Sequence, residues 1–214
     1  MRSCKATGFT LVEMLVSLAI MGLLAVTVVV NMNSGKRTEE LRNSARQLAA
    51  DIRSMQSRAL AAGDVKACPK GSMLMVCENT TAGCTDPAQC SGTVPAVYGV
   101  MATTSATSYV LFAEVEPSTV DYWMDNNDEL MARRPLLQVA NQDVEIKEIQ
   151  VPGAMGLPPT VASIAFMRQS GTNRLYDGTG VEPSIIKIIL RHKLSDAELG
   201  LEINRVTGRV SILN

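Results

Sequence analysis

The feature that most constrains this chain is a long apolar run near its N-terminus, residues 9–30. The run reads FTLVEMLVSLAIMGLLAVTVVV, and its 22 residues include one charged side chain, Glu13. A helix of this length spans roughly 33 Å, enough to cross the hydrocarbon core of a bilayer. The whole chain has 214 residues, of which 46% are hydrophobic, so the remainder can also bury a core. We therefore predict a membrane-spanning helix followed by a globular part.

Two ordinary explanations account for part of this run. A secretory signal peptide has an apolar core of about 7–15 residues and then a small-residue cleavage site. This run is longer, and the residues NMNSGKR that follow it match such a site poorly. A signal anchor fits the length but leaves Glu13 unexplained. Because a carboxylate inside an apolar span costs about 2.5–3.5 kcal/mol on insertion, we expect Glu13 to have a partner and a function.

The residues around Glu13 carry a specific resemblance. The sequence GFTLVE (residues 8–13) follows a short leader, MRSCKAT, that contains Arg2 and Lys5. This arrangement resembles the type IV prepilin signal. The resemblance implies that a prepilin peptidase cuts between Gly8 and Phe9 and then methylates the Phe9 amine. It also implies that Glu13 meets the Phe9 amine of a neighbouring subunit, since a buried carboxylate is tolerated when an ammonium neutralises it.

A second pattern extends the helix beyond the apolar run. Apolar residues recur from Leu41 to Ala62 at alternating spacings of four and three, which predicts one narrow buried stripe. Gly63 comes directly after this stripe and is a natural helix stop. We predict a helix over 9–62, with residues 9–30 in the membrane. The stripe is short for a coiled coil, so we expect it to pack against a sheet of the same chain.

After Gly63 the pattern changes to short apolar runs with period two, which predicts strands. The predicted strands are 73–77, 97–102, 109–115, 136–139, 144–151, 160–167, 185–191, 199–204 and 209–213. A phase change within 144–151 predicts a β-bulge, and residues 204–208 read as a hairpin connection ending in Gly208. The predicted fold class is α+β, a long helix packed on a mainly antiparallel β domain. The predicted divisions are a removed leader (1–8), the helix (9–62) and a globular domain (63–214).

Three later segments carry a second resemblance. They are Tyr98-Gly99-Val100, residues 109–112 (YVLF) and the closing residues 203–210 (INRVTGRV). They resemble the H-type pseudopilin domain, which occurs in a minor pseudopilin of type II secretion and in minor pilins linked to DNA uptake. The resemblance implies a long N-terminal helix and a sheet domain.

Five cysteines occur, and Cys4 lies in the leader. The remaining four are Cys68, Cys77, Cys84 and Cys90. They could bind zinc, but their spacings contain no C-x₂-C pair. A domain outside the cytoplasm favours two disulfides. Three pairings are possible, and we predict Cys68–Cys77 with Cys84–Cys90, closing a loop of low apolar content.

Charged residues are segregated along the sequence. Residues 36–70 contain eight basic and four acidic side chains, whereas residues 114–148 contain nine acidic and three basic ones. Solvated faces are the ordinary explanation, and complementarity between filament subunits is the alternative. Asp125, Asn127 and Glu129 alternate as calcium ligands can, although the glycine of an EF-type loop is missing. Trp123 is either a loop anchor on the core or an exposed partner contact.

Arg205 and Arg209, near the C-terminus, are the candidate DNA contacts, because uptake-linked relatives use basic residues there. Two arginines are few for a phosphate footprint. The single histidine, His192, lies in a predicted strand and is interpreted as structural. No phosphate-binding loop, carboxylate pair or nucleophile elbow stands out in the sequence. We therefore expect no enzyme activity, no cofactor and no metal beyond the weak calcium candidate.

Together these features predict a structural subunit, a minor pilin or pseudopilin of a bacterial type IV pilus or type II secretion filament. Its expected partners are other pilin or pseudopilin subunits, the prepilin peptidase and the membrane. Its expected location is the cytoplasmic membrane, crossed once, and then an extracytoplasmic filament. Basic residues flank both ends of the span, so the resemblance alone gives the orientation. The alternative is a binding module for DNA, a surface or a secreted substrate, displayed by the same anchor.

Overall fold

The computed structural model describes residues 10–70, 73–77, 87–115, 130–136, 143–153, 157–168, 173–178 and 182–213. These residues form one long helix, α1 (Leu11–Leu60), a short 3-10 helix, η1 (Pro87–Gln89), and strands in three antiparallel sheets. Internal contacts divide the chain into two compact units, Met1–Glu39 and Glu40–Asn214. The predicted α+β class is confirmed.

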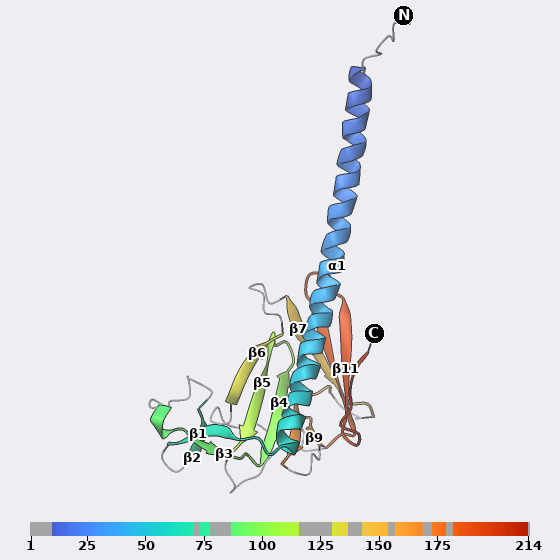
Figure 1. The fold of residues 1–214 in the computed structure, drawn as a ribbon. Helices are drawn as coiled ribbons and strands as arrows, with labels where there is room; N and C mark the ends of the chain where they lie inside the picture. The colour runs from blue at the N-terminus through green and yellow to red at the C-terminus, as the bar shows by residue number, and fades with distance from the viewer. Residues whose placement is uncertain are drawn as a thin grey trace, which may run out of the picture. The chain divides into compact units, whose positions relative to one another are not determined.

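All the described strands belong to the second unit (Figure 1). The five-stranded sheet has the order β6 (Leu130–Pro135), β5 (Ser108–Glu114), β4 (Val97–Thr103), β8 (Val161–Met167) and β9 (Asn173–Tyr176). The four-stranded sheet has the order β12 (Val210–Leu213), β11 (Glu198–Asn204), β10 (Ile185–His192) and β7 (Val144–Gln150). The three-stranded sheet has the order β2 (Met73–Val76), β1 (Val65–Lys70) and β3 (Ser91–Thr93). Two hydrogen bonds join the larger sheets, from Ser105 N to Ile146 O (2.7 Å) and from Ile146 N to Ala106 O (2.9 Å).

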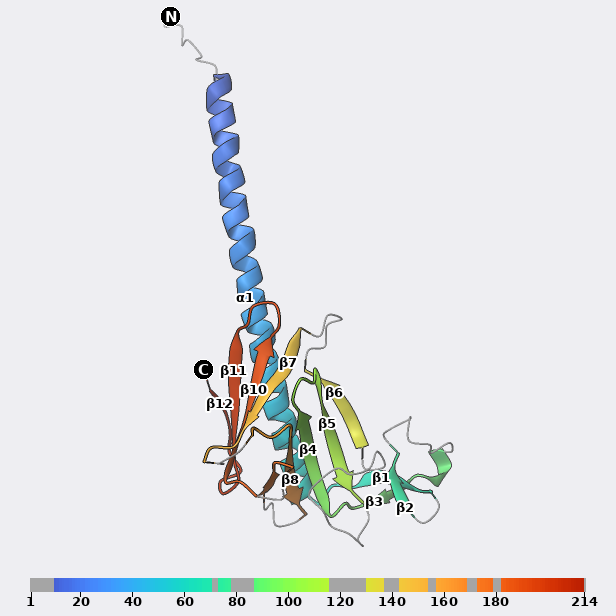
Figure 2. The ribbon, with the colours of Figure 1, turned by 180° about the vertical axis from the view of Figure 1, so that it is seen from behind.

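The C-terminal half of α1 supplies one side of the core. It lies in front of the sheets in Figure 1 and behind them in Figure 2. The buried helix residues follow the predicted stripe: Leu41, Ala45, Leu48, Ala49, Ile52, Met55 and Ala59. They share one hydrophobic cluster with alternating residues of both larger sheets, for example Tyr98, Ile164 and Ile188. The helix ends at Leu60, two residues before the predicted end at 62. Ala62, rather than Gly63, takes the positive φ of 47° that follows the last turn, and Gly63 N donates to Arg58 O at 3.0 Å.

Polar contacts fasten this half of the helix to the strands. The buried His192 ring lies with Nε2 3.2 Å from Glu40 Oε2, and its Nδ1 accepts from Leu194 N at 3.3 Å. Tyr109 donates its hydroxyl to Asp51 Oδ2 at 2.5 Å. Burial and this carboxylate raise the pKa of Tyr109. The contact between His192 and the helix agrees with a structural role for that histidine.

Tyr98 fastens the C-terminal end of the helix. Its ring is buried, and its hydroxyl donates to the Gly63 carbonyl, one of the acceptors that follow the last helical turn. Burial raises the pKa of Tyr98 to about 12, because the ionised phenolate loses its hydration inside the core. Gly99, the next residue, leaves room for the Phe112 ring, which an added Cβ would meet at 2.2 Å.

Most of the predicted strands and both predicted irregularities are observed. The register between β10 and β7 shifts between Ile189 and Leu190, which confirms the bulge, and residues 204–208 connect the paired strands β11 and β12. The structure adds four strands that the sequence did not predict: β1, β3, β6 and β9. β1 contains a proline, β6 contains two arginines, and β3 and β9 are short, so the apolar alternation is weak in each. Of the predicted strand 136–139, Leu136 is not in a strand and the rest lies outside the described residues.

Candidate assembly site

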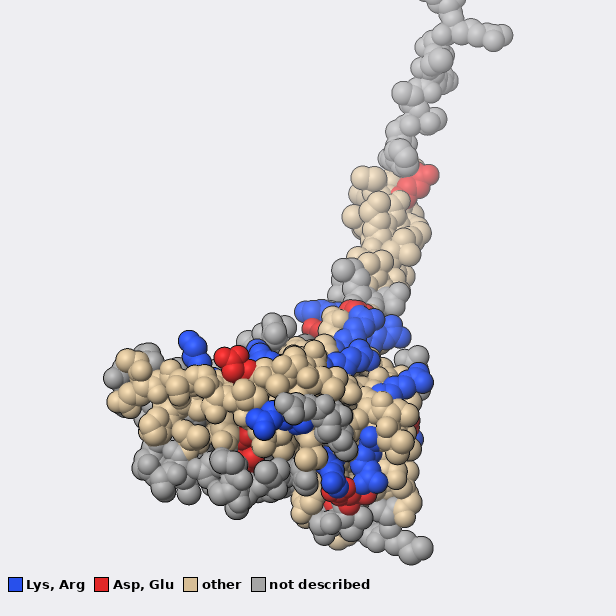
Figure 3. Space-filling model, turned by 60° about the horizontal axis from the view of Figure 1, so that its bottom comes forward, with Lys and Arg blue, Asp and Glu red and all other residues tan. Residues whose placement is uncertain are grey.

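The N-terminal part of α1 is an apolar surface that is exposed within the described residues. Residues Leu11–Val28 have a mean hydropathy of 2.3, and none of this segment is buried within the structure. Its large apolar side chains are 53% to 76% exposed. Figure 3 shows this segment as uncharged apart from one acidic side chain near its N-terminal end. By length and composition it is long and apolar enough to cross a membrane.

Glu13, the charged residue of this segment, is held by Thr10 at the start of the helix. Thr10 N and Thr10 Oγ1 both donate to Glu13 Oε2, at 2.9 and 3.0 Å. In return, Glu13 N donates to Thr10 Oγ1 at 3.3 Å. This reciprocal pair is a capping box, in which two of the unpaired amides at a helix start are satisfied. The capping box was not predicted, although the pattern Thr-x-x-Glu before an apolar run is its sequence signal.

The capping box leaves part of the carboxylate open. Both donors from Thr10 reach Oε2, and Oε1 accepts no hydrogen bond from the residues that the structure describes. A carboxylate can accept about four hydrogen bonds, so a cation can bind it without displacing Thr10. Gly8 and Phe9, the predicted cleavage and methylation residues, lie outside the described residues.

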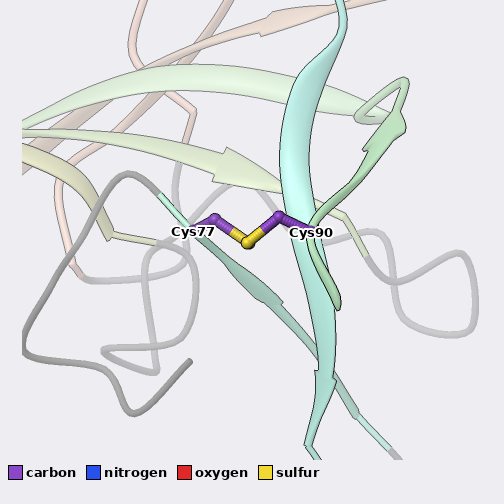
Figure 4. The surroundings of a disulfide bond; sticks show 2 residues. All are labelled: Cys77 and Cys90. Atoms are coloured by element: carbon purple, nitrogen blue, oxygen red, sulfur yellow. A yellow bond between two sulfur atoms is a disulfide. The ribbon is translucent and has the colours of Figure 1, made fainter. Parts of the chain in front are cut away.

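The disulfide connectivity differs from the prediction. Cys77 is bonded to Cys90, with their Cα atoms 6.3 Å apart (Figure 4). The predicted pairs Cys68–Cys77 and Cys84–Cys90 are therefore wrong. The strand order β2-β1-β3 explains this, because Val76 and Ser91, the neighbours of the two cysteines, both pair with Ala67. Cys68 is also disulfide-bonded, and Cys84 lies outside the described residues.

The calcium candidates and the single tryptophan cannot be placed from the described residues. Asp125, Asn127, Glu129 and Trp123 lie outside the described residues. Within the described ranges, no three His, Cys, Asp or Glu side chains are placed to hold a metal ion.

The two candidate DNA contacts differ in their surroundings. Arg205 forms an ion pair with Glu182 at 2.8 Å, and Arg174 reaches the same carboxylate at 2.7 Å. Arg209 is exposed. Since Glu182 offsets part of their charge, this cluster attracts phosphates less than the sequence suggests.

Comparison with known proteins adds one match. Residues 4–29 match the family model of the prokaryotic N-terminal methylation motif. This range contains Gly8, Phe9 and Glu13 and overlaps the exposed apolar segment. No curated protein and no solved structure matches the chain.

Proposed function

We propose that this chain, which its N-terminal methylation motif and apolar helix make a type IV pilin-like protein, is a minor pilin or pseudopilin. In this proposal it is a structural subunit of a type IV pilus or type II secretion filament. One observation carries the proposal: Glu13 lies in an apolar helical segment, residues 11–28, that is exposed within the described residues. The motif match and this geometry point to a structural protein whose partners are membrane and other subunits.

In this proposal the apolar surface suits two successive environments of the helix, the membrane before assembly and the filament after it. Before assembly, lipid tails surround the helix, and the capping box keeps one carboxylate oxygen of Glu13 hydrogen-bonded. After cleavage at Gly8, helices of neighbouring subunits replace the lipid. The new Phe9 ammonium of one subunit then neutralises Glu13 of the next. Removing one partner of such a buried ion pair costs about 3–5 kcal/mol, because the other charge is left buried and unpaired.

This assignment also gives the location and the partners. The precursor waits in the cytoplasmic membrane of a bacterium as a single-pass protein, and the processed subunit joins an extracytoplasmic filament. Its partners are the prepilin peptidase and other pilin or pseudopilin subunits.

Processing gives the direct test of the proposal. Co-expression of the full chain with a prepilin peptidase should yield a product that begins at N-methyl-Phe9, measured by mass spectrometry of the N-terminal peptide. A Gly8→Leu variant should stay uncut, because the peptidase recognises the glycine. An uncut wild-type chain, or a cut after residue 30, would refute the proposal.

Assembly gives the second test. Glu13→Ala should insert into the membrane as well as the wild type but enter filaments at least about tenfold less, because the Phe9 ammonium stays unpaired. Thr27→Ala is the matched control. Thr27 is a polar residue of the same segment whose hydroxyl donates to its own Leu24 carbonyl at 2.8 Å. Normal filament content of the Glu13 variant would rule out the pairing role.

A further inference from the structure

Two connections of the four-stranded sheet lie at its opposite ends. The strands β10, β11 and β12 follow one another in the chain and pair antiparallel (Figure 2). The connection from β10 to β11 therefore lies at one end of β11, and the connection from β11 to β12 lies at the other. β11 has seven residues, so roughly 20 Å separates these ends. We call residues 193–198 the acidic turn and residues 205–209 the basic turn.

Each turn exposes one large aliphatic side chain. Leu194 of the acidic turn is 61% exposed, and Val206 of the basic turn is 81% exposed. A single exposed aliphatic side chain is ordinary on a protein surface. Here such side chains occur at both ends of the same three strands, and the charges beside them are opposite.

The charges of the two turns are complementary. The acidic turn contains two acidic residues and one lysine, whereas the basic turn contains two arginines and no acidic residue. Lys193, Glu198 and Arg205 form ion pairs within the globular unit. Asp196 and Arg209 are exposed and form no ion pair with the residues that the structure describes. The acidic turn therefore presents a carboxylate beside Leu194, and the basic turn presents a guanidinium near Val206.

Hydrogen bonds hold the basic turn in shape. Asn204 Oδ1 accepts from Val206 N at 2.9 Å and from Thr207 N at 3.0 Å. Gly208 takes a positive φ of 65°, and an added Cβ would meet Asn173 Nδ2 at 2.5 Å, so only glycine fits this place. The turn is thus fixed by its own backbone and by a neighbouring strand.

The buried His192 holds the acidic turn in a similar way. Its backbone N donates to Ala197 O at 2.9 Å, and its backbone O accepts from Ser195 N at 3.2 Å. Its ring Nδ1 accepts from Leu194 N at 3.3 Å. Both turns are therefore formed within the single chain, and a partner that binds them pays little conformational entropy to order them.

We propose that the acidic turn of one copy of this chain packs against the basic turn of the next copy, with Leu194 beside Val206 and Asp196 beside Arg209. The inference rests on the proposed filament function and names the surfaces that meet between subunits. The two turns differ, so the contact is heterologous, and its repetition builds an open helical assembly. The aliphatic side chains remove apolar surface from water, and the opposite charges set the register. Since the turns lie at opposite ends of one sheet, each copy can make both contacts at once.

Cross-linking between two tagged copies tests this contact. One full-length copy carries Ser195→Cys in the acidic turn, and the other carries Thr207→Cys in the basic turn, both at exposed positions. They are expressed together with the prepilin peptidase, and a short thiol-specific cross-linker is added to the membranes. A product that joins the two tags is expected. Two copies that both carry Ser195→Cys, or both carry Thr207→Cys, are the matched controls and should not be joined, and neither should copies without an added cysteine.

Substitution of the aliphatic side chains makes the test specific. Val206→Asp puts a negative charge against the acidic turn and should lower the cross-link at least about tenfold. Leu194→Lys in the other copy should then restore it, because the new charges are opposite. Leu157→Asp is the matched control and should leave the cross-link intact, since Leu157 is a 95% exposed aliphatic residue outside both turns.

Arg209 tests the charged part of the contact separately. Arg209→Gln removes the charge and should lower the cross-link about two- to fivefold, because an exposed ion pair contributes little. Arg209→Lys keeps the charge and should leave the cross-link unchanged. Equal cross-linking by the glutamine and lysine variants would contradict the pairing of Arg209 with Asp196.

Three results would overturn the inference as a whole. They are equal joining of like and unlike turns, a cross-link that ignores Val206→Asp, and no joining of the two tags in a chain that is processed at Gly8. If no cross-link forms and lipid shields the Ser195→Cys thiol from a water-soluble reagent, or added DNA shields the Thr207→Cys thiol, that turn binds lipid or DNA instead. A chain that is not cut at Gly8 would refute the proposed function and this inference together, whereas a processed chain without the cross-link refutes the inference alone.

Discussion

The two halves of α1 are both helical, but they differ in which apolar side chains they bury. Residues 41–60 bury a narrow apolar stripe against two sheets and expose arginines, so their partner is in the same chain. Residues 11–28 are predominantly apolar around the helix and exposed within the described residues, and the proposed function gives them lipid and other subunits as partners. An amphipathic surface indicates a helix that packs on its own domain, and a uniformly apolar one indicates lipid or other helices. Under the proposed function, the position of Glu13 in the second kind of surface makes the anchor an assembly element as well.

The largest expected effect tests this contrast with one substitution in each half. Leu48→Ala removes a fully buried side chain and should lower the free energy of unfolding of the globular unit by about 2–5 kcal/mol. Leu18→Ala, at a residue that is 65% exposed, should leave that free energy unchanged. Denaturant unfolding of the full chain in detergent, followed by circular dichroism of the strands, measures both. Equal losses in the two variants would contradict the separation of the halves.

A smaller effect concerns the end of the packed half. Tyr98→Phe removes the hydroxyl that donates to the Gly63 carbonyl and should cost about 1–3 kcal/mol, because that buried acceptor loses its donor. The raised pKa also gives a pH dependence. Tyr98 ionises near pH 10 in the unfolded chain and at about 12 in the folded one. Its contribution is therefore complete below pH 10 and is lost as the pH rises toward about 12.

Unfolding free energies at pH 8 and pH 11 check the tyrosine prediction. The wild type should lose more stability between these values than Tyr98→Phe does, since only the wild type carries the Tyr98 hydroxyl whose ionisation opposes folding. A fall of the same size in both proteins would show that the Tyr98 hydroxyl is not buried.

The smallest effect concerns the beginning of the exposed half. Thr10→Val removes the two hydrogen bonds that the Thr10 hydroxyl forms with Glu13, keeps the one from the Thr10 amide, and should destabilise the first turn by about 0.5–2 kcal/mol. Hydrogen exchange at residues 11–14 in micelles should then be faster, while the globular unit is unchanged. Thr10→Ser keeps the hydroxyl and should exchange like the wild type. If valine and serine behave alike, the capping box does not form.

Local patterns in the sequence predicted the features that depend on near neighbours. Each of these features repeats or breaks a period over a few residues. They are the apolar run, its single carboxylate, the four-three stripe of the helix, the bulge in β7 and the 204–208 connection. The capping box at Thr10 belongs to this group too, although it was overlooked. The strands that escaped prediction are short or polar, so neighbouring strands and the core, rather than their own pattern, decide their conformation.

The amino-acid sequence by itself determined that this chain has a membrane-length helix with a processing motif and an amphipathic continuation, because both depend on spacing along one element. Only the tertiary structure decided which distant residues meet. Cys77 bonds to Cys90 because β2 and β3 flank β1, and His192 reaches Glu40 across 152 residues because β10 ends beside the helix. Arg205 is partly neutralised because β9 and the start of β10 bring Arg174 and Glu182 to it. Such pairings depend on strand order and packing, which leave no periodic trace in the sequence.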